Sequence, residues 1–444
     1  MNRVFSTLVI LIFFNISFLH AQEKEKKAQK VKQGWTFGAV PAIAYDSDIG
    51  FRYGGLVNFY DYGDGSTYPK YRHSLYLEWS RTTKGSGTNQ FTYDSEYLIP
   101  GVRTSAEVSY LTEQALDFYG FNGYNAYYNS AFEDDQSPLY KSRMFYRMDR
   151  KLLRIRADFQ GKIGDSHFRW LAGFAHYGIK ADTVDIERLN KGKTAEDCLP
   201  SIGGGLYGDF VRWGLIPEGQ VHGGNTELLK LGIVFDTRDN EPNPMTGIWT
   251  EAQLLLAPRF LGNGNLSYSR IAITHRQYFT ILPEVMNFAY RLSYQAKLGG
   301  TMPFYMLPFV FNTAPGITRD GLGGGKTIRG VLRNRVVGED FVYGNFELRY
   351  KVIRTVILNQ NVYIALAGFV DGGMITGKYK LPETNDPNAI QWLDQGDEEK
   401  LHMSYGGGLH IALNENFIVT ADYGIAADPR DGDHGLYIVM NFLF

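Results

Sequence analysis

The stretch Leu153-Arg154-Ile155-Arg156-Ala157-Asp158-Phe159-Gln160 decides the fold, because apolar and polar residues alternate along it without a break. A β-strand points successive side chains to opposite faces, so a period of two collects the apolar side chains on one face. A helix would mix the two sets around its surface. The same separation recurs along 229–238 and 286–298. The pattern predicts strands that have one apolar and one polar face.

Sixteen such runs follow one another from Trp35 to the end of the chain. Their approximate limits are 35–45, 48–60, 70–82, 88–98, 102–118, 142–163, 167–182, 227–238, 247–257, 266–280, 285–298, 338–351, 361–373, 401–413, 417–427 and 435–444. Tight turns such as 164–166 and 282–284 are set against long loops at 119–141, 183–226, 299–337 and 374–400. Short turns on one side and long loops on the other are typical of an outer-membrane barrel.

Closure of the sheet follows from the solvent that such strands would face. Every backbone N–H and C=O group in hydrocarbon needs a partner, so a membrane-spanning sheet must close on itself. The sequence therefore predicts an all-β fold, a transmembrane antiparallel β-barrel of about 16 strands that spans residues 35–444.

Composition agrees with this fold and argues against several classes of function. The chain has 50 glycines, 30 tyrosines and 29 phenylalanines among 444 residues, which suits many strands, turns and aromatic girdles. A net charge of -2 gives no electrostatic reason to expect a nucleic-acid partner. Cys198 is the only cysteine, so neither an internal disulfide nor a cysteine cluster for zinc is expected. We expect no cofactor and no metal.

The residues before the barrel resemble an export signal and a linker. Asn2-Arg3, the apolar run from Val4 to Leu19 and the small residue Ala21 are typical of a secretory signal peptide that covers residues 1–21. Residues 22–34 are a charged linker that is too short to form a domain. The sequence predicts export through the Sec pathway to the outer membrane of a Gram-negative cell.

A glycine-rich stretch, 323–331, lies in the long loop before the strand 338–351 and contains Arg329. The period of two turns Glu347 inward on that strand and Asp371 inward on the next one. An unpaired charge in a confined lumen is costly, so we expect Arg329 to approach these two carboxylates. Solvation of all three groups in a wet pore is the alternative. A phosphate-binding loop is disfavoured, because Asp320 stands where that motif needs glycine.

Four short segments resemble motifs of the BamA/TamA-type assembly barrels, the bacterial surface antigen family, which also includes two-partner secretion transporters. They are Ile328-Arg329-Gly330-Val331, 344–347, 369–373 and 235–247. The resemblance implies that the long loop folds into the lumen, where Arg329 meets Glu347 and Asp371. Val331 stands where the family usually has an aromatic residue. The family's polypeptide-transport-associated domains have no room in 22–34, so a barrel-only member is expected.

The resemblance also implies a weak seam between the first and last strands, here 35–45 against 436–444. The last strand alternates and ends on an aromatic residue, which resembles a recognition signal for barrel assembly. An exposed strand edge at this seam would template an incoming strand. The residues expected at the seam are Trp35, Phe37, Leu436, Ile438, Phe442 and Phe444, with the apolar members of the last strand sharing one face.

Three functions fit this sequence. The resemblance implies outer-membrane protein insertion or polypeptide export without enzymatic chemistry, with lipid and lipopolysaccharide around the barrel and client polypeptides or assembly subunits as partners. A passive channel or a structural accessory barrel is the second hypothesis. An outer-membrane lipid hydrolase is the third, with His176 or His275 on the outer face, but no serine stands at a matching position. We therefore expect no lipid turnover.

Overall fold

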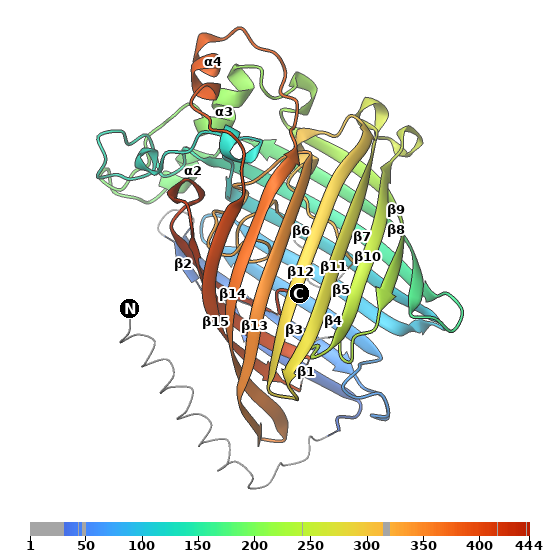
Figure 1. Cartoon of the computed structure of the whole chain (residues 1–444). Coiled ribbons are helices and arrows are strands. Elements are labelled where there is room, and N and C mark those ends of the chain that lie inside the picture. The colour runs from blue at the N-terminus through green and yellow to red at the C-terminus, as the bar shows by residue number, and fades with distance from the viewer. Residues whose placement is uncertain are drawn as a thin grey trace, which may run out of the picture.

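The computed structural model describes residues 31–42, 44–46, 50–241, 243–313, 320–414, 416–440 and 442–444. The predicted signal peptide and most of the predicted linker lie outside the described residues. The strands form one antiparallel sheet that rolls into a barrel, with helices gathered at one end (Figure 1). The prediction of an all-β antiparallel barrel is confirmed.

The sheet contains seventeen strand segments, which follow one another around the barrel in chain order. Their bounds are β1 (Trp35–Pro41), β2 (Ala44–Asp46), β3 (Gly50–Asp61), β4 (His73–Thr82), β5 (Gly87–Ile99), β6 (Val102–Asp117), β7 (Arg147–Lys162), β8 (Phe168–Asp182), β9 (Gly223–Asp236), β10 (Gly247–Ala257), β11 (Tyr268–Leu282), β12 (Met286–Gly300), β13 (Asp340–Ile357), β14 (Gln360–Gly377), β15 (His402–Leu413), β16 (Phe417–Ala426) and β17 (His434–Met440). Because β1 and β2 both pair with β3, they are two parts of one strand, and the seventeen segments make sixteen barrel strands.

The side chains alternate between the outer surface and the lumen as the period of two requires. On β7 the outward Ile155 is 39% exposed, whereas the inward Arg154 is 1% exposed. On β13 the outward Leu348 is 44% exposed and the inward Glu347 is 1% exposed. Apolar residues therefore face the outside, and charged residues are concentrated in the lumen.

Two strand limits differ from the predicted ones for identifiable reasons. The predicted run 142–163 begins only at Arg147, because Phe145 and Tyr146 pack into the apolar core of the loops. The hairpin of β13 and β14 is longer than predicted, because its turn needs only Leu358 and Asn359. Both residues have a positive φ, 47° and 62°, as in the tightest β-hairpin turns.

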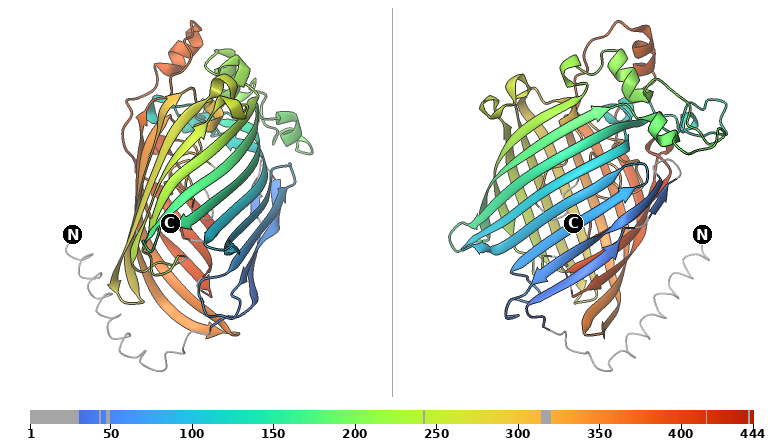
Figure 2. Two further views of the ribbon diagram at one scale, coloured as in Figure 1. Left: turned by 90° about the vertical axis from the view of Figure 1, so that its right-hand side faces the viewer. Right: turned by 180° about the vertical axis from the view of Figure 1, so that it is seen from behind.

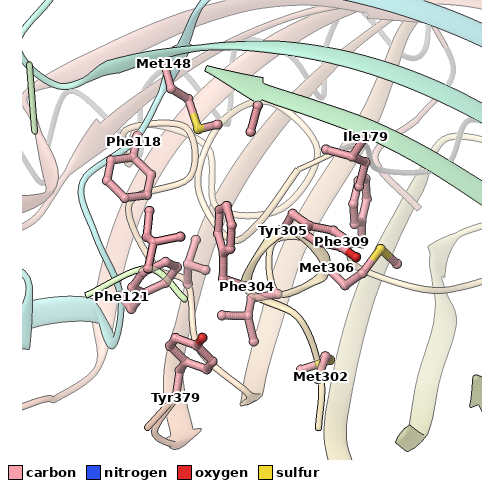
Figure 3. Packing of buried hydrophobic residues seen from close by; sticks show 14 of the residues in the cluster. Phe118, Phe121, Met148, Ile179, Met302, Phe304, Tyr305, Met306, Phe309 and Tyr379 are labelled. Carbon is pink, nitrogen blue, oxygen red and sulfur yellow. The ribbon is translucent and has the colours of Figure 1, made fainter. Parts of the chain in front are cut away.

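The long loops at the other end of the barrel pack into a hydrophobic core of their own (Figures 1 and 3). It joins Phe118 from the loop after β6, Phe304 and Phe309 from the loop after β12, and Tyr379 from the loop after β14. Three short helices belong to these loops: α2 (Ile186–Asn190), α3 (Gly205–Arg212) and α4 (Pro387–Leu393). None of the helices in the described ranges is long and apolar enough to cross a membrane.

Figure 2 shows the barrel from two further sides, with the loops and helices at one end and tight turns at the other. We call these the loop end and the turn end. The apolar core at the loop end holds the first part of the long loop between β12 and β13. The rest of that loop, 320–339, continues to the strand β13 and carries the site described next.

Candidate functional site

The tip of the loop between β12 and β13 is a compact buried structure inside the barrel. Leu322 and Val336 form an antiparallel bridge, and the Gly324 N–H donates to the Val331 carbonyl at 2.9 Å. Ile328 and Val331 are completely buried, and they pack against inward residues of β13 and β14. Local hydrogen bonds and apolar contacts thus hold the glycine-rich stretch in one shape at the wall.

Arg329 is the centre of this site, and its side chain is fully buried. Its Nε and Nη2 donate to the two oxygens of Asp371 at 2.9 and 3.0 Å, and its backbone N–H donates to the same carboxylate at 3.0 Å. Its Nη1 donates to Glu347 at 2.9 Å. The structure therefore places Arg329 against both carboxylates named from the sequence. We call Arg329 and its carboxylate partners the latch.

A third carboxylate, Asp422 on β16, also binds Arg329, with Nη1 to Oδ2 at 3.1 Å. The Arg329 guanidinium lies 3.4 Å from the ring centroid of Phe369, which provides a cation–π contact. Sequence reasoning missed both partners. The alternation of the strand 417–427 already turned Asp422 inward, but no local pattern connected it with Arg329.

Two of the three latch carboxylates have further buried partners, which help to balance their charge. Glu347 accepts from Arg349 Nε at 2.7 Å, and Asp422 lies 2.8 Å from His410 Nε2. Buried ions are tolerated when they are paired and their remaining hydrogen-bonding capacity is filled. The latch is therefore a structural fastening in which buried charged groups bind one another.

The backbone of the loop tip touches β16 and approaches β17. A Cβ atom at Gly424 on β16 would lie 2.6 Å from the Arg329 carbonyl, so only glycine leaves room for the tip. Gly330, with a φ of 98°, donates its N–H to the Tyr437 hydroxyl on β17 at 3.0 Å. The loop tip thus contacts β13, β14, β16 and β17, which are four of the last five strands.

The residues expected at the seam divide into two groups. Trp35, Phe37, Leu436 and Ile438 face outward, with exposed fractions of 56, 70, 65 and 67%. The expectation that Phe442 and Phe444 share this outer face is wrong, because they are only 7 and 6% exposed. Strand β17 ends at Met440, and the last residues turn into the lumen, where aromatic rings meet guanidinium groups.

Strand β17 pairs with β16 over seven residues. At the turn end β16 also approaches β1, because the Phe417 ring lies over Gly38, where a Cβ would come within 2.2 Å of it. The Tyr60 hydroxyl donates to the Asn416 carbonyl at 3.0 Å across the same gap.

Among the described residues, the outward histidines contact Glu227 and Thr250 and not a serine of the kind that a lipid hydrolase would need. His176 lies 2.5 Å from Glu227, and His275 lies 2.7 Å from the Thr250 hydroxyl. Across the described ranges, no group of three or more histidine, cysteine or acidic side chains could hold a metal ion.

A cavity of about 880 Å³ lies in the lumen beside the loop tip, lined by polar residues such as Arg52 and Gln90.

Comparison with known proteins gives a family and a fold. A family model described as the Omp85 superfamily domain matches residues 74–444, and no curated protein sequence matches. The solved structure of BamA from Haemophilus ducreyi lacking POTRA domains 1–3 is 16% identical, with a TM-score of 0.46, 92% of this chain covered and 69% of that one. CdiB from Escherichia coli is 10% identical with a TM-score of 0.52, 93% of this chain covered and 62% of that chain. At 10% identity, the likeness to CdiB shows the fold alone. Because the family model covers most of its length, this chain belongs to the Omp85 superfamily.

Proposed function

We propose that this outer-membrane barrel takes part in inserting outer-membrane proteins or exporting polypeptides, and that it does so without enzymatic chemistry. Membership of the Omp85 superfamily supports an outer-membrane barrel with a role of this general kind. Outer-membrane lipid and lipopolysaccharide would surround it, and client polypeptides or assembly subunits would be its partners.

The observation that carries the proposal is the position of the loop tip on the last strands of the sheet. Arg329 binds Asp422 on β16 and Gly330 binds Tyr437 on β17, so the loop tip is fastened to the last two strands. An unpaired strand edge is a template for pairing with another chain. A last strand that the loop tip holds in place suits the temporary pairing of a client strand.

The packing of the lumen supports this function over a passive channel. The loop tip fills part of the lumen, and the loops at the far end form a hydrophobic core. An open pore would conduct ions steadily in a planar lipid bilayer. We expect brief or no openings, and a large steady conductance would support the channel instead.

The proposal is tested by depleting the protein in its native host and measuring the amounts of outer-membrane and secreted proteins. We expect depletion to lower the amount of a subset of outer-membrane or secreted proteins, as quantified by mass spectrometry. Wild-type protein should restore them and Arg329→Ala should not. Arg354→Ala is the matched control, because its pair with Glu284 is exposed on both sides, 41 and 62%. Unchanged levels of every such protein after depletion would overturn the proposal.

A further inference from the structure

The last three residues, Phe442-Leu443-Phe444, form what we call the tail, which lies inside the lumen rather than in line with β17. We propose that Arg291 and Arg349 join this tail and the latch into one lock, so that release of either one loosens the other. The coupling is a property of the fold and holds whether or not the protein handles client polypeptides.

The tail is held in a specific seat made by two buried arginines, each 2% exposed. Arg291 Nη1 donates to the Leu443 carbonyl at 3.2 Å, and Arg349 Nη2 donates to the Phe444 carbonyl at 3.0 Å. The Arg349 guanidinium lies 4.2 Å from the ring centroid of Phe442, and the Arg291 guanidinium lies 5.2 Å from that of Phe444. Hydrogen bonds to the backbone and cation–π contacts to the rings thus hold the same segment.

The same two arginines also hold the loop. Arg291 Nη2 donates to the Lys326 carbonyl at 3.2 Å, and it donates to Asn345, whose own amide donates to the Thr327 carbonyl at 2.6 Å. Arg349 donates to Glu347, which is one of the carboxylates that bind Arg329. Each guanidinium therefore binds the tail through one nitrogen and, through another, either the loop or a carboxylate that binds the loop.

A third connection runs through His410. Its ring makes an edge contact with Phe442, with the ring centroids 5.2 Å apart, and its Nε2 lies 2.8 Å from Asp422. Asp422 in turn accepts from Arg329. The tail and the latch thus share partners at three buried points, on β12, β13 and β15.

Shared buried partners give the coupling its physical cause. When the loop leaves, Arg291 loses the Lys326 carbonyl and Glu347 loses one of its two cations. A buried donor or charge that loses a partner is costly, so the remaining groups rearrange around what is left. Arg291 and Arg349, which bind the tail, are then no longer held in place. The reverse holds when the tail leaves, because Arg349 and Arg291 then lack their carbonyl acceptors.

The experiment measures hydrogen–deuterium exchange of two peptides in the folded full-length protein, one covering the loop tip 321–335 and one covering the end of the chain. We expect Arg329→Ala to speed exchange in both peptides by at least about fivefold, the lower range of typical coupling between sites. The paired variant Phe442→Ala/Phe444→Ala should speed exchange at the loop tip to a similar degree. Arg291→Gln/Arg349→Gln should loosen both segments together.

Arg156→Gln is the matched control, because Arg156 is a buried lumen arginine on β7 that binds Glu107 and Asp158 rather than the tail or the loop tip. It should leave both peptides within about twofold of the wild type, below the range of typical coupling. Exchange that rises only in the segment that carries each substitution would overturn the proposal. If Arg329→Ala does not fold, Arg329→Lys takes its place, because it keeps a positive charge but loses the fork that holds Asp371. Hydrogen–deuterium exchange is then measured in the same two peptides and judged in the same way.

Discussion

Two arginines only four positions apart on the same loop are fastened in opposite ways. Arg329 is fully buried and binds carboxylates on three different strands, β13, β14 and β16. The side chain of Arg333 is 36% exposed, and it binds Asp320 of its own loop at 2.8 Å and Glu113 on β6. Arg150 on β7 also contacts Asp320 and Glu113. The loop is thus attached to both sides of the barrel, by a fully buried site on one side and a partly exposed one on the other.

The difference in burial between Arg329 and Arg333 shows where the loop is held firmly. Water can replace the partners of Arg333 when its ion pairs break, so those pairs contribute little net stability. Water has no access to the three carboxylates around Arg329, so removing the guanidinium leaves buried negative charges without a counterion. We therefore expect the tip to be the firm attachment, and the contact with β6 and β7 to be the adjustable one.

Arg329→Ala should have the largest effect on stability. It leaves Asp371, Glu347 and Asp422 buried with fewer cations, and we expect a loss of about 3–5 kcal/mol. The temperature at which the band shifts in heat-modifiable gel mobility measures this loss. Arg329→Lys should keep part of the stability, because its ammonium group retains the charge without the fork. A wild-type transition for Arg329→Ala would refute the assignment of Arg329 as the firm attachment.

Gly424→Ala tests the same site through its shape rather than its charge. The added methyl group would lie 2.6 Å from the Arg329 carbonyl, so the tip must move away from β16. We expect a loss of about 1–3 kcal/mol, together with faster hydrogen exchange at the loop tip. Gly368→Ala is the control, because a Cβ there meets nothing within 4 Å. Equal behaviour of the two variants would show that the tip does not depend on this close approach.

Arg333→Ala should cost much less, at most about 1 kcal/mol, because its ion pairs are partly exposed and each has a second cation in Arg150. The loss should shrink further at high salt, whereas that of Arg329→Ala should not. Both are measured with the same mobility assay at two salt concentrations. A loss of stability as large as that of Arg329→Ala would show that the two arginines hold the loop equally firmly.

Glu133, in the loop after β6, is a buried carboxylate with few partners, unlike the carboxylates that bind Arg329. Burial raises the pKa of Glu133 from 4.5 to about 7, with Arg147 opposing this shift and Asp117 adding to it. The folded loop therefore keeps a proton between pH 4.5 and 7 that the unfolded loop releases, so its stability is greatest below pH 4.5 and falls as pH rises to 7. We expect protease cleavage within 118–146 to be faster at pH 8 than at pH 5. Glu133→Gln should remove most of this dependence, and an unchanged dependence would assign it to another group.

The sequence by itself determined the period-two strands, the face on which most strand side chains lie and a count of about sixteen strands. It also determined that Glu347 and Asp371 are charged groups that face the lumen, whereas the family resemblance implied that Arg329 joins them there. These are local properties, because the two faces of a strand follow from its backbone alone. Only the tertiary structure decided that Asp422 joins the latch and Tyr437 binds the loop tip, that the loops share a core, and that Phe442 and Phe444 turn inward. Those outcomes depend on which strands the rolled sheet places around the loop tip, and on guanidinium groups on β12 and β13 that hold the end of the chain.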